Sequence, residues 1–96
     1  MKYEWDEEKE KGNRKKHKIS FEEAIEVFED EERIERYDIE HSSEEEERWQ
    51  IIGQTKKGKV LFVVYVEIVR RRIRLISARR AEISEEKIYF GSRKRR

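Results

Sequence analysis

Residues 60–66 read Val-Leu-Phe-Val-Val-Tyr-Val, an apolar run without a single charged or polar-only side chain. A strand with one face in water alternates apolar and polar residues, whereas a strand covered on both faces does not. The β-branched valines also favour a strand over a helix. Residues 60–66 therefore predict a central strand of a sheet that has packed elements on both sides.

Further strands are predicted on both sides of this run. Before it, the Lys-Lys-Gly-Lys sequence at 56–59 reads as a hairpin turn. The turn follows a strand that begins at Trp49 and contains Gly53, where we expect a bulge. Ile34, Tyr37 and Ile39 predict a long first strand. After the run, a tight reversal at 67–71 leads into a strand over 73–81, which completes an antiparallel meander of four strands.

Two helices are predicted ahead of the strands. A short extended segment at 2–5 precedes Asp6, which can cap a polar helix that ends near His17. Ser20 and Glu23 have the spacing of a capping box, so a second helix begins there. Its apolar residues recur at the spacing of one helix face, which we expect in the core: Phe21, Ala24, Ile25 and Phe28.

The C-terminal part predicts one more helix, capped by Ser84 and running to about Phe90. The fold class is thus α+β, with an antiparallel four-stranded sheet packed by two N-terminal helices and a C-terminal helix. Residues 1–90 form a single domain, and residues 91–96 are expected to be a basic, flexible tail.

The amino-acid composition excludes several classes of protein. The 96 residues contain no cysteine, which excludes disulfides and thiolate metal sites, and 49% of them are charged. Such a charged surface over an apolar pattern is typical of thermophile proteins. The sequence has no signal-peptide pattern and no run long enough to span a membrane, so we expect a cytoplasmic protein.

Charge is distributed unevenly. Residues 1–46 have 9 Lys and Arg against 18 Asp and Glu, whereas residues 47–96 have 15 against 5. This polarity indicates a basic nucleic-acid face and a separate acidic face. The alternative is that the two halves neutralise each other in the fold.

The strand at 73–81 reads Ile-Arg-Leu-Ile-Ser-Ala-Arg-Arg-Ala, and core packing does not require its arginines. Guanidinium groups bind phosphate oxygens in a bidentate manner and stay charged at any working pH. Arg74 and Arg79 therefore predict an anion site at the end of a sheet. Equally, both arginines could simply lie on a solvated face.

The remaining candidate residues suit RNA chemistry. Only two histidines are present, without metal-ligand spacing, and the chain lacks a Gly-rich phosphate loop and a serine nucleophile motif. Cleavage of RNA through its 2′-hydroxyl needs only proton transfer and stabilisation of negative charge. The candidates for these roles are Lys16, His17, Arg48, Arg74 and Arg79.

Two of these candidates have simpler explanations. His17 could be a cation favoured at a helix C-terminus. Arg48 could pair with the carboxylates of residues 44–47, which belong to an acidic connection over 40–47 that we expect to be a solvated loop.

A series of short motifs, in order over about residues 3–90, is shared with one known family. The motifs are Trp5-Asp6, Lys9, Asn13, Lys16-His17, Ile19, Phe21, Ala24, Phe28, Asp38, His41, Glu47-Arg48-Trp49, Ile52-Gly53, Arg74-Leu75-Ile76-Ser77-Ala78-Arg79, Ala81, Glu85 and Tyr89. On these residues the sequence resembles the BrnT family of type II toxin–antitoxin toxins. Two positions depart from the family pattern: Lys18, where the family often has Gly, and Ile68, where it often has Arg.

The resemblance implies a RelE-like fold and a ribonuclease toxin that needs no cofactor, cleaves RNA and arrests translation. It further implies neutralisation by a BrnA-type antitoxin whose ribbon-helix-helix domain binds operator DNA, so that DNA contact is made only through the antitoxin. Carried onto this sequence, the implied site adds RNA-binding residues to the candidates above: Glu47, Ser77 and Tyr89.

We therefore predict a small metal-independent endoribonuclease in which His17 transfers protons and Lys16 is an auxiliary cation. Arg48, Arg74 and Arg79 would stabilise the phosphate and the transition state. The alternatives are a non-catalytic RNA- or DNA-binding module that uses the same basic face, and a structural partner protein. Convergence of His17 and the three arginines in one cleft would favour the enzyme.

Overall fold

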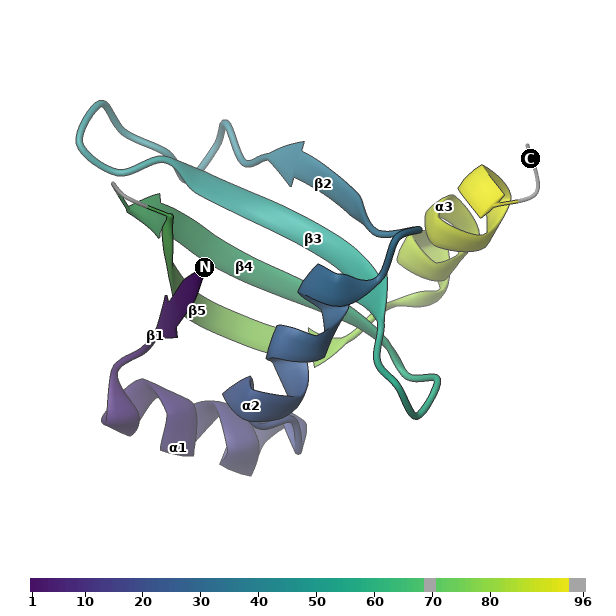
Figure 1. The fold of residues 1–96 in the computed structure, drawn as a ribbon, viewed down its shortest axis with the longest axis horizontal. Helices are drawn as coiled ribbons and strands as arrows, with labels where there is room; N and C mark the ends of the chain where they lie inside the picture. Colours follow the sequence, from purple (N-terminus) through teal and green to yellow (C-terminus); the bar gives the residue numbers. More distant parts are fainter. Residues whose placement is uncertain (69–70, 94–96) are drawn as a thin grey trace.

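The sheet of this protein has five strands in the order β1-β5-β4-β3-β2 (Figure 1). The computed structural model describes residues 1–68 and 71–93. Along the chain its elements are β1 (Lys2–Glu4), α1 (Glu7–His17), α2 (Phe21–Ala24), the 3₁₀ helix η1 (Ile25–Glu29), β2 (Ile34–Tyr37), β3 (Arg48–Gln54), β4 (Val60–Ile68), β5 (Arg72–Arg80) and α3 (Ile83–Arg93).

The predicted α+β class and order of elements are confirmed, but the four-stranded antiparallel sheet is wrong in detail. Strands β2 to β5 form the predicted antiparallel meander. The short N-terminal extended segment, which the sequence places outside the sheet, is its fifth strand, β1, and pairs parallel with β5 so that Glu4 lies beside Arg74. The sequence does not indicate this pairing, because the partner lies 70 residues away.

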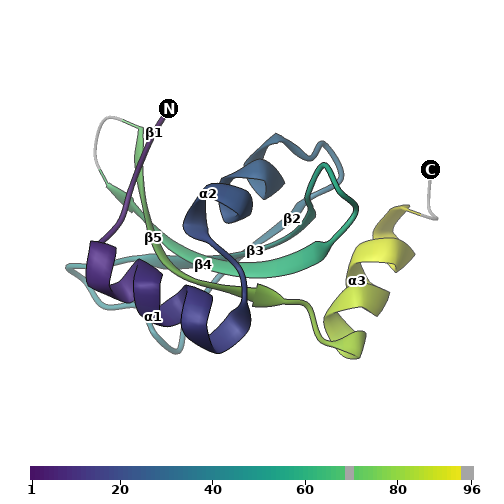
Figure 2. The same cartoon turned by 90° about the horizontal axis from the view of Figure 1, so that it is seen from below.

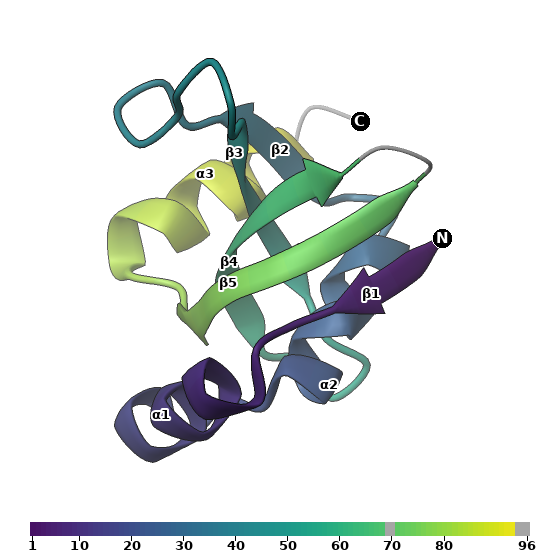
Figure 3. The same ribbon diagram turned by 90° about the vertical axis from the view of Figure 1, so that its left-hand side faces the viewer.

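Strand β4 is central, as its composition predicts, and α3 packs against one end of the sheet on the face opposite α2 (Figure 2). Helix α2 and η1 cover one face. Figures 2 and 3 show α1, α3 and the loop 38–47 on the opposite side of the sheet. We call the side that carries α3 the α3 face.

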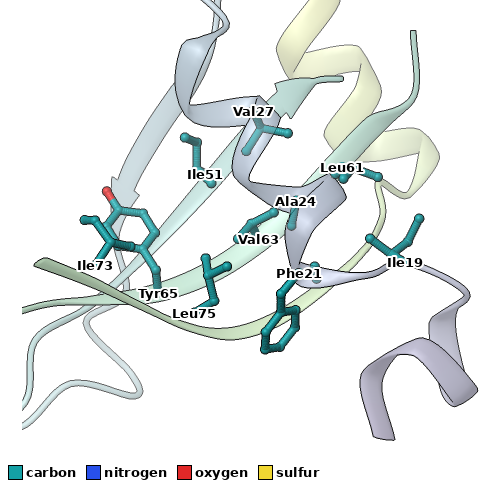
Figure 4. Packing of buried hydrophobic residues seen from close by; sticks show 11 residues of the cluster. Ile19, Phe21, Ala24, Val27, Ile51, Leu61, Val63, Tyr65, Ile73 and Leu75 are labelled. Atoms are coloured by element: carbon teal, nitrogen blue, oxygen red, sulfur yellow. The ribbon is translucent and has the colours of Figure 1, made fainter. Parts of the chain in front are cut away.

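The main core lies between the sheet and the α2–η1 segment (Figure 4). The predicted apolar helix face is largely confirmed, because Phe21 and Ala24 are fully buried and Ile25 and Phe28 pack against the cluster. The Ser20 side chain accepts from the backbone N–H of Glu23, as the capping box predicts.

The second helix is shorter than an α-helical pattern suggests. It is α-helical for four residues and then tightens to a 3₁₀ helix from Ile25, which turns Val27 fully into the core. Gly53 on β3 permits this approach. A Cβ atom there would lie 2.9 Å from Val27 Cβ, and the pairing of β3 with β4 runs through Gly53 without the predicted bulge.

A smaller core joins α3 to the other face of the sheet. It consists of Ile52, Val60 and Tyr89, with Ile34, Phe62 and Ala81 packed against it. Helix α3 begins at Ile83, one residue before the predicted cap Ser84. Instead, Glu85 Oε1 accepts from the backbone N–H of Glu82 (2.8 Å), the return half of a capping box.

Three further expectations are corrected. Strand β2 ends at Tyr37, and Ile39 is 78% exposed in the following loop, so the first strand is short. Helix α3 continues to Arg93, and so residues 91–93 belong to it and not to a tail. The predicted reversal at 67–71 includes residues 69–70, which lie outside the described part of the chain.

Helix α1 extends from Glu7 to His17 with Asp6 as its cap, as predicted. Its Asn13 continues the edge of the sheet beyond β1. The Asn13 amide donates to the carbonyl of Ala78 (2.8 Å) and accepts from the N–H of Ala78 (3.0 Å), and it also donates to the carbonyl of Ile19 (2.9 Å). One buried side chain thus satisfies the backbone edge of β5 and the chain leaving α1.

Candidate active site

An irregularity in β5 places the predicted arginines on one face. The register between β4 and β5 shifts at Val64/Tyr65, so that Ser77 pairs with Val64 and Leu75 with Tyr65, leaving Ile76 unpaired. Arg74 and Arg79 are five residues apart and would point to opposite faces of a regular strand. The extra residue restores them to the same face as Ser77, while Leu75 and Ala78 are buried in the main core.

The strand pairings order the α3 face into rows. Arg48, Val66 and Arg74 are cross-strand neighbours in one row. Gln50, Val64 and Ser77 form the next row, which Arg36 of β2 extends. The third row contains Ile52, Phe62 and Arg79. The face is therefore cationic around its edges, with polar Gln50 and Ser77 between.

Each predicted arginine has a carboxylate partner. Arg48 Nε lies 3.0 Å from Glu46 Oε1, so the expected pairing with the acidic loop is confirmed. Arg74 lies 3.1 Å from Glu4 of β1. These pairs are partly exposed, and pairs of that kind contribute little to stability, so another anion can replace the carboxylate.

Arg79 is the most strongly held of the three. Its Nη1 and Nη2 donate to Oε1 and Oε2 of Glu85 (2.8 and 2.9 Å), and its guanidinium lies 4.4 Å from the centre of the Phe62 ring. These hydrogen bonds raise the pKa of Arg79, against the effect of burial. Burial raises the pKa of Glu85, but Arg79, the N–H of Glu82 and the charge of Arg36 outweigh it, and the net pKa is lowered.

One phosphate cannot contact both ends of this face. Val66 in the first row and Phe62 in the third are four residues apart on β4, a distance of about 13 Å at the rise of a strand. Arg48 and Arg74 therefore form one cationic end of the α3 face, and Arg79 forms the other.

His17 and Lys16 lie at the Arg79 end. They end α1 one turn after Asn13, which is bonded to Ala78, the neighbour of Arg79. His17 is half-buried and Lys16 exposed. Within residues 1–68 and 71–93, no hydrogen bond or ion pair joins His17 to the three arginines. His17 and the three arginines therefore do not converge in one cleft, which is the arrangement that would have favoured the enzyme over a binding module.

The three predicted RNA-binding residues have different environments. Ser77 is half-buried in the middle row. Glu47 is exposed, beside Arg48. Tyr89 is fully buried, and its hydroxyl donates to Asp30 Oδ2 (2.6 Å), so in this arrangement its ring packs α3 and is not available to a bound base.

A polar network on β2, β3 and the loop 38–47 was not predicted. His41 Nδ1 lies 3.1 Å from each carboxylate oxygen of Asp38, which also bonds to Gln50, and Gln50 Oε1 accepts from Arg36 (3.0 Å). Burial raises the pKa of Asp38, but the bonds from His41 and Gln50 prevail, and the net pKa is lowered.

This network reaches Arg48 through the backbone. The N–H of Asp38 donates to the carbonyl of Arg48 (2.8 Å), and the Ser42 hydroxyl both accepts from the N–H of Arg48 (2.8 Å) and donates to the carbonyl of Asp38 (2.6 Å). The loop that was expected to be only solvated therefore fixes His41 at the Arg48 end of the face. The sequence signal was the Asp-x-x-His-Ser spacing at 38–42, present only as part of the family resemblance.

The described part of the chain has neither a metal-binding cluster nor a helix that could span a membrane. In the described part of the chain, no cluster of three or more His, Asp or Glu side chains has an arrangement that would hold a metal ion. No helix there is long and apolar enough to cross a membrane.

Comparison with known proteins identifies the family of the chain. The family described as the ribonuclease toxin BrnT of type II toxin–antitoxin systems matches residues 5–85. The crystal structure of the Brucella abortus ribonuclease toxin BrnT is similar, with a TM-score of 0.58 and 22% sequence identity over 85% of this chain and 97% of that one. At this identity the structural likeness supports the fold alone. No curated protein matches by sequence. Because the family match covers most of the domain, this chain belongs to the BrnT family of ribonuclease toxins of type II toxin–antitoxin systems.

Proposed function

We propose that this protein is a metal-independent endoribonuclease that binds RNA on its α3 face and inhibits translation. The observation that carries the proposal is the irregularity in β5, which brings Arg74, Ser77 and Arg79 to one face. Arg48 joins them from β3 in the same row as Arg74. Core packing does not account for three arginines on one face, whereas a polyanionic ligand does.

The chemistry proposed is internal transphosphorylation. The 2′-oxygen attacks the adjacent phosphorus, the bond from phosphorus to the 5′-oxygen breaks, and a 2′,3′-cyclic phosphate remains. Arginines at one end of the face supply hydrogen bonds and positive charge to the phosphorane-like transition state, which carries more negative charge than the ground state, and the arginine at the other end binds a neighbouring phosphate. The reaction requires one group to accept a proton and one to supply it.

His17 is the proton carrier that the sequence predicts, with Lys16 as an auxiliary cation. Their place beside β5 at the Arg79 end supports a role in holding or cleaving the RNA backbone there. Glu47 adjoins Arg48, and Ser77 lies in the middle row, where both can contact ribose hydroxyls.

The partner proposed is a BrnA-type antitoxin whose ribbon-helix-helix domain binds the operator DNA. A type II system implies an antitoxin. The cationic α3 face is the surface that such a partner would have to cover in order to exclude RNA, and acidic groups on the partner would suit it.

The test is cleavage of a defined single-stranded RNA by the purified chain in the presence of EDTA, with the product ends identified by mass spectrometry. We expect cleavage to continue and the products to have 2′,3′-cyclic phosphate and 5′-hydroxyl ends. Cleavage that stops with EDTA and gives 5′-phosphate ends would contradict the mechanism. RNA binding without cleavage would instead favour a binding module.

A further inference from the structure

The side chain of His41 has the environment of an acid–base group and not that of a residue in a solvated loop. It is 65% exposed, but its Nδ1 faces both oxygens of Asp38, whose side chain is only 8% exposed. The backbone N–H of His41 also donates to Asp38 Oδ1 (3.3 Å). A buried carboxylate that accepts a hydrogen bond from an exposed imidazole fixes the orientation of the ring and its tautomer.

The orientation leaves one nitrogen for a ligand. With Nδ1 donating its hydrogen to Asp38, the Nε2 atom has a free lone pair and can accept a proton. Asp38 is suited to this arrangement, because the bonds from His41 and Gln50 favour its ionised form.

The imidazole belongs to a site with cations. It lines a pocket of about 360 Å³ together with Arg36, Asp38 and Gln50, and the remaining lining residues are Tyr37, Ile39 and Glu40. Ser42 and the backbone pairing of Asp38 connect it to Arg48. A proton acceptor in one pocket with Arg36, on a loop that is bonded to the backbone of Arg48, is the combination that a ribose 2′-hydroxyl next to a phosphate requires.

We infer that His41 is the general base of the RNA cleavage reaction, that Asp38 positions it, and that the scissile phosphate lies at the Arg48–Arg74 end of the α3 face. His41 Nε2 takes the 2′-hydroxyl proton as the bond from O2′ to phosphorus forms. The bond from phosphorus to O5′ breaks with its electron pair on O5′, which takes a proton from water, and the imidazolium returns its proton to the hydroxide.

This inference rests on the proposed ribonuclease function and changes which histidine accepts the proton. His17 lies beside β5 at the Arg79 end, and the Arg79 row is about 13 Å along β4 from the Arg48 row, so a phosphate that His17 contacts would be a different one. In this arrangement His17 and Arg79 hold the RNA backbone beyond the cleaved bond.

The experiment measures the single-turnover cleavage rate of a mapped RNA site for the wild type, His41→Ala, Asp38→Asn, His17→Ala and Glu44→Gln. Glu44 is an exposed residue of the same loop and serves as the control. Binding is measured separately with the same RNA carrying a 2′-deoxyribose at the cleaved position. Melting temperatures establish that each variant folds.

We expect His41→Ala to lower the rate by about a hundredfold to ten-thousandfold with unchanged binding, and added imidazole to restore much of it. Because His41 is largely exposed, its removal leaves the fold intact. Asp38→Asn should lower the single-turnover rate much more than it weakens RNA binding, and imidazole should not rescue it because the misoriented ring is still present. Glu44→Gln should cleave at the wild-type rate.

If the wild type cleaves the RNA and His41→Ala cleaves it at the same rate, the assignment of His41 is wrong, while the proposed ribonuclease function stands. A His41→Ala defect that imidazole leaves unchanged would also overturn the assignment, because that defect would be structural. A loss of cleavage confined to His17→Ala would assign the proton transfer to α1. A wild-type chain that cleaves no RNA would overturn the proposed function and, with it, this inference.

Discussion

The guanidinium of Arg79 donates from both terminal nitrogens to the two carboxylate oxygens of Glu85, at 2.8 and 2.9 Å. The pair joins the end of β5 to the first turn of α3, and Glu85 also accepts the N–H of Glu82 that opens this helix. One carboxylate thus holds the helix start and the arginine of the α3 face together.

Glu85→Gln should therefore lower stability and change its dependence on pH. The folded pKa of Glu85 is lowered, so its contribution is present above the unfolded pKa of about 4.5 and is lost as pH falls through the folded pKa. We expect a loss of about 1.5 to 3 kcal/mol at pH 7. Urea unfolding at several pH values measures it.

The matched control for this change is Glu86→Gln, which removes a neighbouring carboxylate from the same turn. The difference between the two variants should shrink as pH falls from the unfolded pKa through the lower folded pKa of Glu85. If Glu85→Gln and Glu86→Gln unfolded at the same urea concentration at pH 7, the pairing with Arg79 would not stabilise the fold.

Lys18→Gly should stabilise the protein. Lys18 ends α1 with φ 62° and ψ 25°, a left-handed conformation that costs a residue with a Cβ atom about 1 to 2 kcal/mol and glycine much less. The greater freedom of glycine in the unfolded chain offsets part of this gain. A net increase of up to about 1 kcal/mol in unfolding free energy is expected, and thermal melting would show an unchanged or lower Tm if the account were wrong.

Asn13→Ala should destabilise the protein more than most substitutions of a polar residue do. It removes three hydrogen bonds and leaves both backbone groups of Ala78 without their partner at the sheet edge. Leaving buried backbone groups unpaired costs about 1 to 3 kcal/mol each. The exposed Lys15→Ala on the same helix is the control, and equal chemical stability of the two variants would contradict the edge role of Asn13.

Sequence patterns predicted what depends on local periodicity. The apolar run at 60–66 is central, the Ser20–Glu23 cap starts a helix, and the turn at Gly58 closes the β3–β4 hairpin with φ 91°. The parallel pairing of β1 with β5, the change to a 3₁₀ helix at Ile25 and the unpaired Ile76 could not be predicted. They arise from contacts between residues far apart in the chain.

The candidate site shows the same limit. Arg74 and Arg79 were correctly placed on one strand, but their common face depends on an irregularity that the residue spacing argues against. The sequence alone predicts His41 in a solvated loop, because a histidine among carboxylates has the pattern of surface charge. Only the fold reveals that Asp38 is buried beneath it and paired with the Arg48 strand.

Association with an antitoxin should be sensitive to salt. The arginines of the α3 face are partly exposed, and a partner with acidic groups would be steered to them, which raises the association rate more than the final affinity. We expect stopped-flow association to slow markedly between low and physiological salt, as the Debye length falls to about 8 Å. Salt-independent association, with RNA still bound to the complex, would place the antitoxin on another surface.

The RNA cleavage rates of Arg74→Ala and Arg79→Ala test most directly whether the α3 face is the active site. The control is Arg80→Ala, which changes an exposed neighbour on the same strand. Loss of one donor to a developing charge typically costs about a hundredfold to a thousandfold in rate. We expect a loss of this size in Arg74→Ala and a smaller loss in Arg79→Ala, because Arg79 holds the RNA away from the cleaved bond. Arg80→Ala should cleave like the wild type, and all three variants should have native circular dichroism. Folded Arg74→Ala and Arg79→Ala proteins that cleave RNA at the wild-type rate would contradict the assignment of the α3 face as the active site.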